Sequence, residues 1–319
     1  MKVAGIDIDK DTIRVVELQK GMRGASVSNY FKIPLVNGNL SEALKDVIKK
    51  LPEAEIVASF DSRDISFRGI SLPITDMKKI EKAIPFEAEE LLPFPADELI
   101  IDYQVIEKGE RETTVGIVAA KKEKINAQLE AFSSGGIDPK VVNITLSAIS
   151  AIASRYLKEE KGVYAVICLG SSDADVCIFE GEGIRFFRNI SFIEGWEKDV
   201  CNTIYAFQAT WKKDIERVYT CGNRDKEGLL KKEININYNI EPLQIDFTKD
   251  PDIKVDTEYA KALGLALREA DGKGFAVNLR RGKFAYKKEG AETKKRLQYT
   301  VIFGGIAALL IILNLSEKY

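Results

Sequence analysis

A pattern of strand, tight turn and strand occurs twice in this sequence, at residues 3–21 and again at residues 164–190. In both copies apolar residues alternate with other residues on either side of a polar or glycine-containing turn, which is the period of a β-strand. Each copy is followed by a helical pattern, at residues 40–51 and 196–212, and then by another strand. The duplication predicts two related α/β lobes with a cleft between them.

The residues between the two copies predict a smaller unit inserted into the first lobe. Pro93 and Pro95 end a predicted helix, because proline and the residue before it disfavour helical continuation. The predicted order is a helix, two strands around a charged hairpin, a second helix and a last strand, at residues 75–92, 97–122, 123–133 and 139–144. We therefore predict a small inserted α+β subdomain over about residues 65–142. A further helix, residues 145–157, then crosses between the lobes.

The distribution of charge argues against nucleic acid as a partner. The formal net charge is −2 over 319 residues, but basic residues concentrate between Arg280 and Arg296, so the rest of the chain is acidic. Nucleic-acid-binding proteins usually present a basic face to the phosphate backbone. We therefore expect no nucleic-acid partner.

The lack of histidine and the spacing of the cysteines exclude several kinds of active site. The sequence has no histidine, which removes Ser-His-Asp and Cys-His catalysis. Its four cysteines have no CxxC or other metal-like spacing, so we expect no zinc site. We predict that they are small buried apolar residues in a reducing compartment. They are Cys168, Cys177, Cys201 and Cys221.

The C-terminal part of the sequence has the composition of a membrane span. Residues 297–315 carry no charged side chain, and at about 1.5 Å per residue they would cover roughly 28 Å, close to the hydrocarbon thickness of a bilayer. Lys294, Lys295 and Arg296 precede them, which by the positive-inside rule places the N-terminal part in the cytoplasm. We predict one transmembrane helix; the alternative is a buried C-terminal helix of a soluble domain.

Residues 272–296 form a basic, glycine-containing linker before this predicted span. Such a juxtamembrane segment is attracted to anionic membrane lipid by about 1 kcal/mol per basic residue near the surface. The alternative is that these charges only set the topology. Within the predicted span, Gly304 and Ala308 offer a small-residue face that suits pairing with a second copy, as a homodimer, or with a companion membrane protein.

Several segments resemble the actin-like cytoplasmic proteins of type IV pilus and type II secretion platforms. The most specific is residues 81–106, EKAIPFEAEELLPFPADELIIDYQVI, which resembles the inserted subdomain of the pilus M protein (PilM). The opening GIDIDKDTIRVVEL and the later YAKALGLALR are similar to the first hairpin and the last cleft helix of that family. The resemblance implies an α/β, actin-like (ribonuclease H-like) two-lobe fold for a cytoplasmic region, residues 1–271.

The segment after this region resembles a second family. FAVNLRRGKFAYKKEG, followed by a basic cluster and one predicted span, is similar to the juxtamembrane region of the type II secretion L protein (GspL). In that family an actin-like cytoplasmic region is joined covalently to a transmembrane helix, whereas the pilus M protein has no span and captures the tail of a separate membrane protein. The resemblance implies a single-pass protein of the bacterial inner membrane with a cytoplasmic N-terminus.

For function, the resemblance implies a scaffold and not an enzyme. An L-type protein recruits the cytoplasmic hexameric secretion ATPase (GspE-like) to the inner-membrane platform, beside the M- and F-type secretion proteins. The alternative is an ATP-binding switch of the PilM kind in type IV pilus assembly. A sugar kinase of the same fold would need an intact phosphate-binding set and a catalytic base.

The first hairpin departs from the nucleotide-binding pattern of actin-like proteins. In the pilus M family an Asp-Ile pair is followed by glycine; here Asp7 and Ile8 match, but Asp9 replaces the glycine and Lys10 follows. A carboxylate beside a triphosphate would be repelled, by about 4 kcal/mol for unit charges 4 Å apart at an effective dielectric near 20. Lys10 would offset part of this repulsion if its side chain pointed inward.

The second lobe departs from the same pattern. ATP-binding members of the family carry aspartate where this chain has Cys168, although Gly170 and Ser171 keep a plausible turn. The turn that covers the adenosine, usually with two or more glycines, has only Gly222 here. Three elements of the nucleotide site are therefore eroded.

Two further acids, Asp173 and Asp175, are expected to be solvent-exposed turn residues, with at least one of them on an unsuitable face. The sequence thus predicts a degenerate cleft with no catalytic and no metal-binding residues. We expect no hydrolysis and no bound cofactor, with ATP and magnesium as the alternative. The residues left for any nucleotide contact are Asp7, Asp9, Lys10, Gly170, Ser171 and Gly222.

Overall fold

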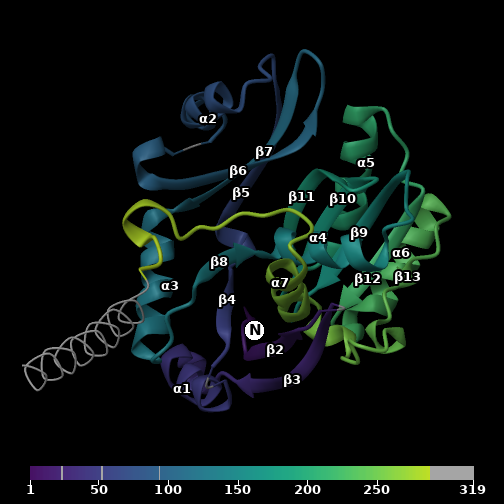
Figure 1. Ribbon diagram of the computed structural model, residues 1–319. Coiled ribbons are helices and arrows are strands. Elements are labelled where there is room, and N and C mark those ends of the chain that lie inside the picture. The colour runs from purple at the N-terminus through teal and green to yellow at the C-terminus, as the bar shows by residue number, and fades with distance from the viewer. Residues whose placement is uncertain (23, 52, 93, 288–319) are drawn as a thin grey trace, which may run out of the picture. The chain divides into compact units, whose positions relative to one another are not determined.

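The computed structural model is shown in Figure 1. The residues that it describes are 1–22, 24–51, 53–92 and 94–287. The chain divides into two compact units, Met1–Phe284 and Ala285–Tyr319, and the elements below belong to the first. The predicted span at residues 297–315 lies outside the described residues. Within the described ranges, no helix is both long and apolar enough to cross a bilayer.

The first lobe is built on a mixed five-stranded sheet of order β3-β2-β1-β4-β8. Its strands are β1 (Lys2–Ile8), β2 (Thr12–Lys20), β3 (Ala25–Pro34), β4 (Glu55–Phe60) and β8 (Val141–Ile144). Helices α1 (Leu40–Lys50) and α3 (Lys122–Ser134) cover one face, where Leu44 and Phe132 pack with Ile6 in a buried cluster. The alternating apolar residues of the opening stretch thus form one layer of this core.

The second lobe repeats this arrangement with a sheet of order β11-β10-β9-β12-β13. Its strands are β9 (Val163–Leu169), β10 (Asp173–Glu180), β11 (Gly183–Ser191), β12 (Arg217–Gly222) and β13 (Leu243–Gln244). Helices α5 (Trp196–Trp211) and α6 (Glu227–Tyr238) contribute the buried Ile204 and Leu230 to its core. In both lobes the first strand pairs antiparallel with the second and parallel with the strand after the helix. The predicted duplication is confirmed.

Two helices lie between the lobes, α4 (Thr145–Tyr156) and α7 (Ala260–Asp271), as Figure 1 shows. Both are buried along most of their length, which explains their small apolar residues. Ile149 of α4 and Leu263 of α7 belong to one hydrophobic cluster that also takes Val16 from the first sheet and Val166 from the second. The two sheets therefore share a core through these helices.

The inserted subdomain is a three-stranded antiparallel sheet of order β5-β7-β6 with one helix on its face. Its elements are β5 (Ile65–Leu72), α2 (Met77–Leu91), β6 (Leu99–Lys108) and β7 (Thr113–Lys121). Asp76 caps α2, because its carboxylate accepts hydrogen bonds from the backbone N–H groups of Lys78 and Lys79. Ile80 and Ile84 of the helix pack in one buried cluster with strand residues such as Ile117.

The insertion is shorter than the sequence predicted. Strand β8 pairs in parallel with β4 of the first sheet, and Phe132 of α3 lies in the core of the first lobe. The assignment of residues 122–142 to the inserted subdomain is therefore wrong, and the insertion ends at Lys121. A short apolar run such as residues 139–144 predicts a buried strand but does not say which sheet takes it.

The prediction that the cysteines are buried apolar residues is confirmed. All four are free and buried, and burial holds the pKa of the Cys177 thiol well above its ordinary value. A neutral, buried thiol acts as a packing residue and not as a nucleophile. The remaining regular segments are short 3₁₀ turns at Val36–Gly38, Ser62–Asp64, Ala96–Glu98, Arg224–Lys226, Phe247–Lys249, Thr257–Tyr259 and Gly282–Phe284.

Candidate functional site

The turns of the two equivalent hairpins, β1–β2 and β9–β10, meet at one carboxylate. Asp9 lies in the first turn, and its Oδ2 accepts a hydrogen bond from the backbone N–H of Ser171 in the second turn at 2.9 Å. The Ser171 hydroxyl donates to Asp9 Oδ1 at 2.6 Å, and the backbone N–H of Lys10 donates to the same oxygen at 2.8 Å. The lobes are thus joined directly at the mouth of the cleft.

An arginine on strand β2 completes the surroundings of this carboxylate. Arg14 Nη1 lies 3.0 Å from Asp9 Oδ2, and Arg14 Nε lies 3.7 Å from Glu258 Oε2. Although burial acts to raise the pKa of Asp9, hydrogen bonds from Ser171 and Lys10 hold it below the ordinary value. Asp9 is therefore ionised at neutral pH, and its charge is balanced by Arg14.

Deeper in the cleft, a buried lysine on α7 binds two acids of strand β10. Lys261 Nζ lies 2.7 Å from Asp175 Oδ2 and 3.5 Å from Asp173 Oδ1. The amide of Asn189 on β11 donates to both of these carboxylates, at 2.9 and 3.0 Å. Burial opposes the charge of Lys261, but Asp175, Asp173 and Asp7 hold its pKa well above the ordinary value.

The expectation that Asp173 and Asp175 are solvent-exposed turn acids is wrong. Both begin strand β10 and are buried, with Asp175 completely inaccessible. Residues two apart on a strand share a face, so both acids point toward Lys261 and neither is turned away from the cleft. Lys261 was not identified from the sequence. One signal could have identified Lys261. It is a lone lysine among alanines and leucines, on a helix that the sequence predicts to pack in the cleft.

Asp7, at the end of β1, is also buried beside this group. The hydroxyl of Ser59 on β4 donates to Asp7 Oδ1 at 3.2 Å. Burial raises the pKa of the Asp7 carboxyl to about 6, although nearby Lys261 acts to lower it. Ionised Asp7 therefore lowers the stability of the folded protein at neutral pH.

Replacing Asp7 with asparagine should stabilise the protein at neutral pH. Because the folded-state pKa of about 6 lies above the ordinary 3.8, the folded protein keeps a proton that the unfolded chain loses, and stability falls as pH rises between these values. Asp7→Asn removes this loss, so its free energy of unfolding should exceed that of the parent by up to about 3 kcal/mol at pH 7.

Urea unfolding at pH 4 and pH 7 measures this difference, which should be small at pH 4. Asp11→Asn is the matched control, since Asp11 lies exposed in the same turn and water already solvates its carboxylate. An advantage of Asp7→Asn that is equal at both pH values would contradict the assignment.

The two glycines predicted for the site support the backbone and present no open surface. The N–H of Gly170 donates to the carbonyl of Asp173 at 2.8 Å and closes the second turn. Gly222 has a φ of +94°, and a Cβ there would lie 2.1 Å from the carbonyl oxygen of Leu169. Its N–H donates to Thr257 Oγ1 at 3.0 Å. Gly222 is therefore required for close packing of β12 against β9.

Two neighbouring cavities share Asp9 and Lys10, a small one between the two hairpins and a larger one lined by the first lobe. Asp7, Asp9, Lys10 and Lys261 line a cavity of about 30 Å³, which is the volume of roughly one water molecule, whereas ligand pockets measure about 300–1,000 Å³. Lys10 is exposed at its edge. Within the described residues no group of acids and cysteines is arranged to hold a metal ion. The space between the two hairpins is therefore too small for a triphosphate, whereas the larger cavity beside Arg63 and Gln128 measures about 260 Å³, just below the usual size of a ligand pocket.

A second feature is the segment Phe275–Phe284, here called the strap, which runs over strands β6 and β8. Phe275, Val277, Leu279 and Phe284 are buried. The backbone N–H of Leu279 donates to the carbonyl of Val142 on β8 at 2.8 Å. The compact unit thus continues to Phe284, past the boundary at residue 271 that the sequence predicted, and the first part of the predicted linker is packed structure.

Polar contacts fix the strap to the inserted subdomain as well. The Asn278 N–H donates to Asp102 Oδ2 at 2.8 Å, and Arg281 Nη2 lies 2.8 Å from Asp102 Oδ1. The Asn278 side chain accepts from the Val142 N–H at 3.2 Å. Because Asp102 belongs to β6 and Val142 to β8, the strap joins the insertion to the first lobe.

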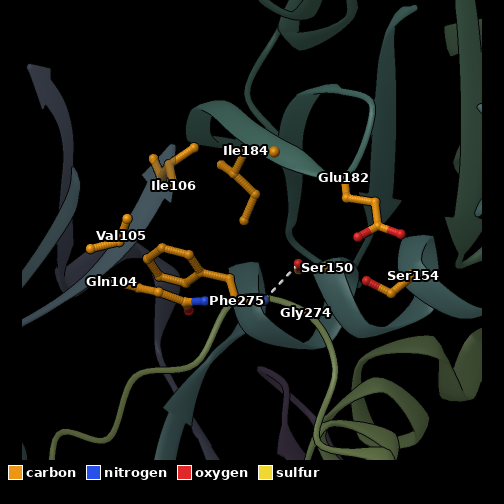
Figure 2. Close-up of a pocket in the computed structure, with 10 residues that line it drawn as sticks. Gln104, Val105, Ile106, Ser150, Ser154, Glu182, Ile184, Gly274 and Phe275 are labelled. Carbon is orange, nitrogen blue, oxygen red and sulfur yellow. Dashed lines mark hydrogen bonds between the residues drawn. The ribbon is translucent and has the colours of Figure 1, made fainter. Parts of the chain in front are cut away.

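A hollow of about 230 Å³ lies beside the first residues of the strap, as Figure 2 shows. Its walls come from Gln104–Ile106 of β6, Ser150 and Ser154 of α4, the β10–β11 hairpin and Phe275. The backbone N–H of Phe275 donates to Ser150 Oγ at 2.8 Å. The strap therefore forms one wall of this hollow.

Comparison with known proteins identifies the fold. A family model described as type IV pilus assembly protein PilM matches residues 5–197. Among solved structures, the PilM–PilN type IV pilus biogenesis complex is similar with a TM-score of 0.70 and 20% identity, covering 84% of this chain and 98% of that chain. A comparison with curated proteins gave no match.

Two further structures share the fold at lower identity. The cytoplasmic domain of EpsL, an inner membrane component of the type II secretion system of Vibrio cholerae, has a TM-score of 0.54 and 12% identity, covering 89% of this chain and 100% of that chain. A Bacteroides thetaiotaomicron protein with an actin-like ATPase fold has a TM-score of 0.50 and 12% identity, covering 79% and 94%. The predicted actin-like fold is confirmed.

Proposed function

Because this chain belongs to the type IV pilus assembly protein PilM family, we propose that it is a scaffold of a type IV pilus or type II secretion machine. In this proposal its actin-like unit recruits the cytoplasmic assembly ATPase and its own C-terminal segment connects that unit to the inner membrane. It carries out no hydrolysis. Its partners in the membrane are the companion platform proteins and a second copy of the chain.

The strap is the observation that carries this proposal. The chain leaves the actin-like unit through a segment with four buried apolar side chains and an ion pair to Asp102. Each buried side chain of this size contributes about 1.5–3 kcal/mol, so the exit point is firmly attached. The PilM–PilN complex joins two proteins, and we propose that here the following residues, 288–319, supply the membrane link covalently.

The arrangement of the cleft supports the non-enzymatic part of the proposal. The donors of Ser171 are engaged by Asp9, and Lys261 is neutralised by buried aspartates. A general base or nucleophile needs access to its substrate, whereas Asp9 is bound by Ser171 and Arg14, and Lys261 is bound by the two buried aspartates. Recruitment of a partner needs none of them.

The full chain, expressed together with the pilus and secretion assembly ATPases of its own organism, should be found in the membrane fraction and retain one of them in EDTA without nucleotide. Retention of a pilus ATPase or of a secretion ATPase would identify the machine. Retention only with Mg·ATP would replace the scaffold with a nucleotide-dependent switch, and a chain found only in the soluble fraction would contradict the membrane link.

Replacing Leu279 with aspartate should detach the strap. Leu279 is completely buried, and losing its packing costs about 2–5 kcal/mol, enough to raise the detached fraction more than tenfold. Limited proteolysis within residues 272–287 should accelerate correspondingly. Lys273→Asp, at an exposed position just before the strap, is the control. Equal cleavage rates for the two variants would show that the strap does not hold the exit point.

A further inference from the structure

The donors around Asp9 are of the kinds that bind phosphate in other proteins. They are two backbone N–H groups, of Lys10 and Ser171, the Ser171 hydroxyl and the Arg14 guanidinium. Backbone amides in a turn form concave anion sites, and arginine binds oxyanions through charge-assisted hydrogen bonds. Lys10 and Arg14 come from the first lobe and Ser171 from the second. The set is therefore an oxyanion site assembled from both lobes.

We infer that this oxyanion site has a resident anion, the Asp9 carboxylate, which holds the two lobes together without nucleotide and excludes phosphate from the cleft. Both Asp9 oxygens are used: Oδ1 accepts from Lys10 and Ser171, and Oδ2 accepts from Ser171 and Arg14. Its side chain is only 9% exposed. An entering phosphate would have to displace a carboxylate that is covalently part of the site.

The charges around the cleft explain why the exclusion of phosphate depends on Asp9. Asp7, Asp173 and Asp175 surround Lys261, so that cation is already compensated. Arg14 and the neutral donors bind Asp9. Arg14 also has a longer contact with Glu258. Removing Asp9 leaves these donors without an acceptor and takes away one negative charge from the cleft. Asp9 is thus the residue that determines whether the cleft accepts an anion.

This inference goes beyond the proposed function, because it concerns the state of the cleft and holds whatever the partner is. In a nucleotide-dependent switch, the phosphate supplies the contacts that draw two segments together. Here the side chain supplies them permanently. The structure therefore predicts one closed arrangement of the two hairpins at all nucleotide concentrations.

The test compares Asp9→Gly with the parent, both as the full chain in detergent, by hydrogen–deuterium exchange at Ser171. The Ser171 amide should exchange at least tenfold faster in Asp9→Gly, and millimolar inorganic phosphate or Mg·ATP should slow it again. Neither probe should change the parent. Recovery with phosphate alone would identify a general oxyanion site, and recovery with Mg·ATP only would identify a nucleotide-specific one; both agree with the inference.

Asp11→Gly is the matched control, since it makes the same change at an exposed position of the same turn and should leave Ser171 exchange unchanged. Asp9→Asn keeps the shape of the side chain and loses its charge, so it should show a smaller acceleration and remains informative if Asp9→Gly does not fold. Unchanged exchange in both Asp9 variants, no response of Asp9→Gly to either anion, or slowed exchange in the parent with Mg·ATP would each overturn the inference.

Discussion

Replacing Lys261 with methionine should lower the free energy of unfolding by about 3–5 kcal/mol at pH 7, the cost of leaving one partner of a buried ion pair alone. Methionine matches the length of the lysine stem but removes the cation that lies 2.7 Å from Asp175 Oδ2. Asp175 is completely buried, so water cannot replace the lost partner. Urea unfolding measures the loss.

A second variant separates the lost ion pair from simple loss of packing. Adding Asp175→Asn to Lys261→Met removes the unpaired charge and should recover a large part of the stability, as replacing both members of a buried pair often does. Lys254→Met is the control at an exposed position and should stay within about 0.5 kcal/mol of the parent. A loss below about 1 kcal/mol for Lys261→Met would mean that the aspartates do not depend on it.

The duplicated fold could be predicted because local patterns determine most of it. Alternating apolar residues marked β1 and β2, and the helix predicted at residues 40–51 is α1 at Leu40–Lys50. The helix predicted at 196–212 is α5 at Trp196–Trp211. Each of these segments has its apolar residues on one face, so their periodicity alone locates it. The end of the insertion was predicted wrongly. Strand β8 is buried on both faces, and tertiary packing, not its own sequence pattern, determines which strand it pairs with.

The strap shows a different limit of sequence analysis. Its basic and glycine residues are typical of a linker, and the sequence alone predicts that Arg280 and Arg281 are juxtamembrane charges. In the structure these arginines lie against Asp138 and Asp102, while Phe275 and Leu279, which precede them in the chain, are buried. A segment without regular secondary structure has no period to identify it, so only its tertiary contacts distinguish it from a linker.

The sequence identified Asp9 as a residue of the candidate cleft but placed two other acids wrongly. Asp9 was expected to act by repelling phosphate; the structure adds that its carboxylate binds Ser171 of the other lobe. Asp173 and Asp175 were assigned to an exposed turn because acids near glycine usually are exposed. Their partner, Lys261, is almost ninety residues away in sequence. Its place on an apolar helix marks it as unusual, but the sequence does not say which acids it binds.

Replacing Gly264 with alanine should lower the free energy of unfolding by about 3 kcal/mol or more, at or above the upper end of the usual range for overpacked core positions. Gly264 lies on α7 where it crosses α4, and a Cβ there would lie 2.3 Å from the carbonyl oxygen of Ala148. Backbone atoms cannot move aside as a side chain can, so the helices themselves must separate. Chemical unfolding measures the loss, and Gly5→Ala should act alike, since its Cβ would lie 2.0 Å from the carbonyl oxygen of Ala262.

The control makes the same change on a helix with open space. A Cβ at Gly228 of α6 meets no atom within 4 Å, so Gly228→Ala should be neutral or stabilise by up to about 1 kcal/mol through helix propensity. Equal effects at Gly264 and Gly228 would contradict the close approach of α4 and α7. Because these two helices share one core with both sheets, separating them should also weaken the contact between Asp9 and Ser171. Faster exchange of the Ser171 amide in Gly264→Ala would show that closure of the cleft depends on the helix crossing beneath it.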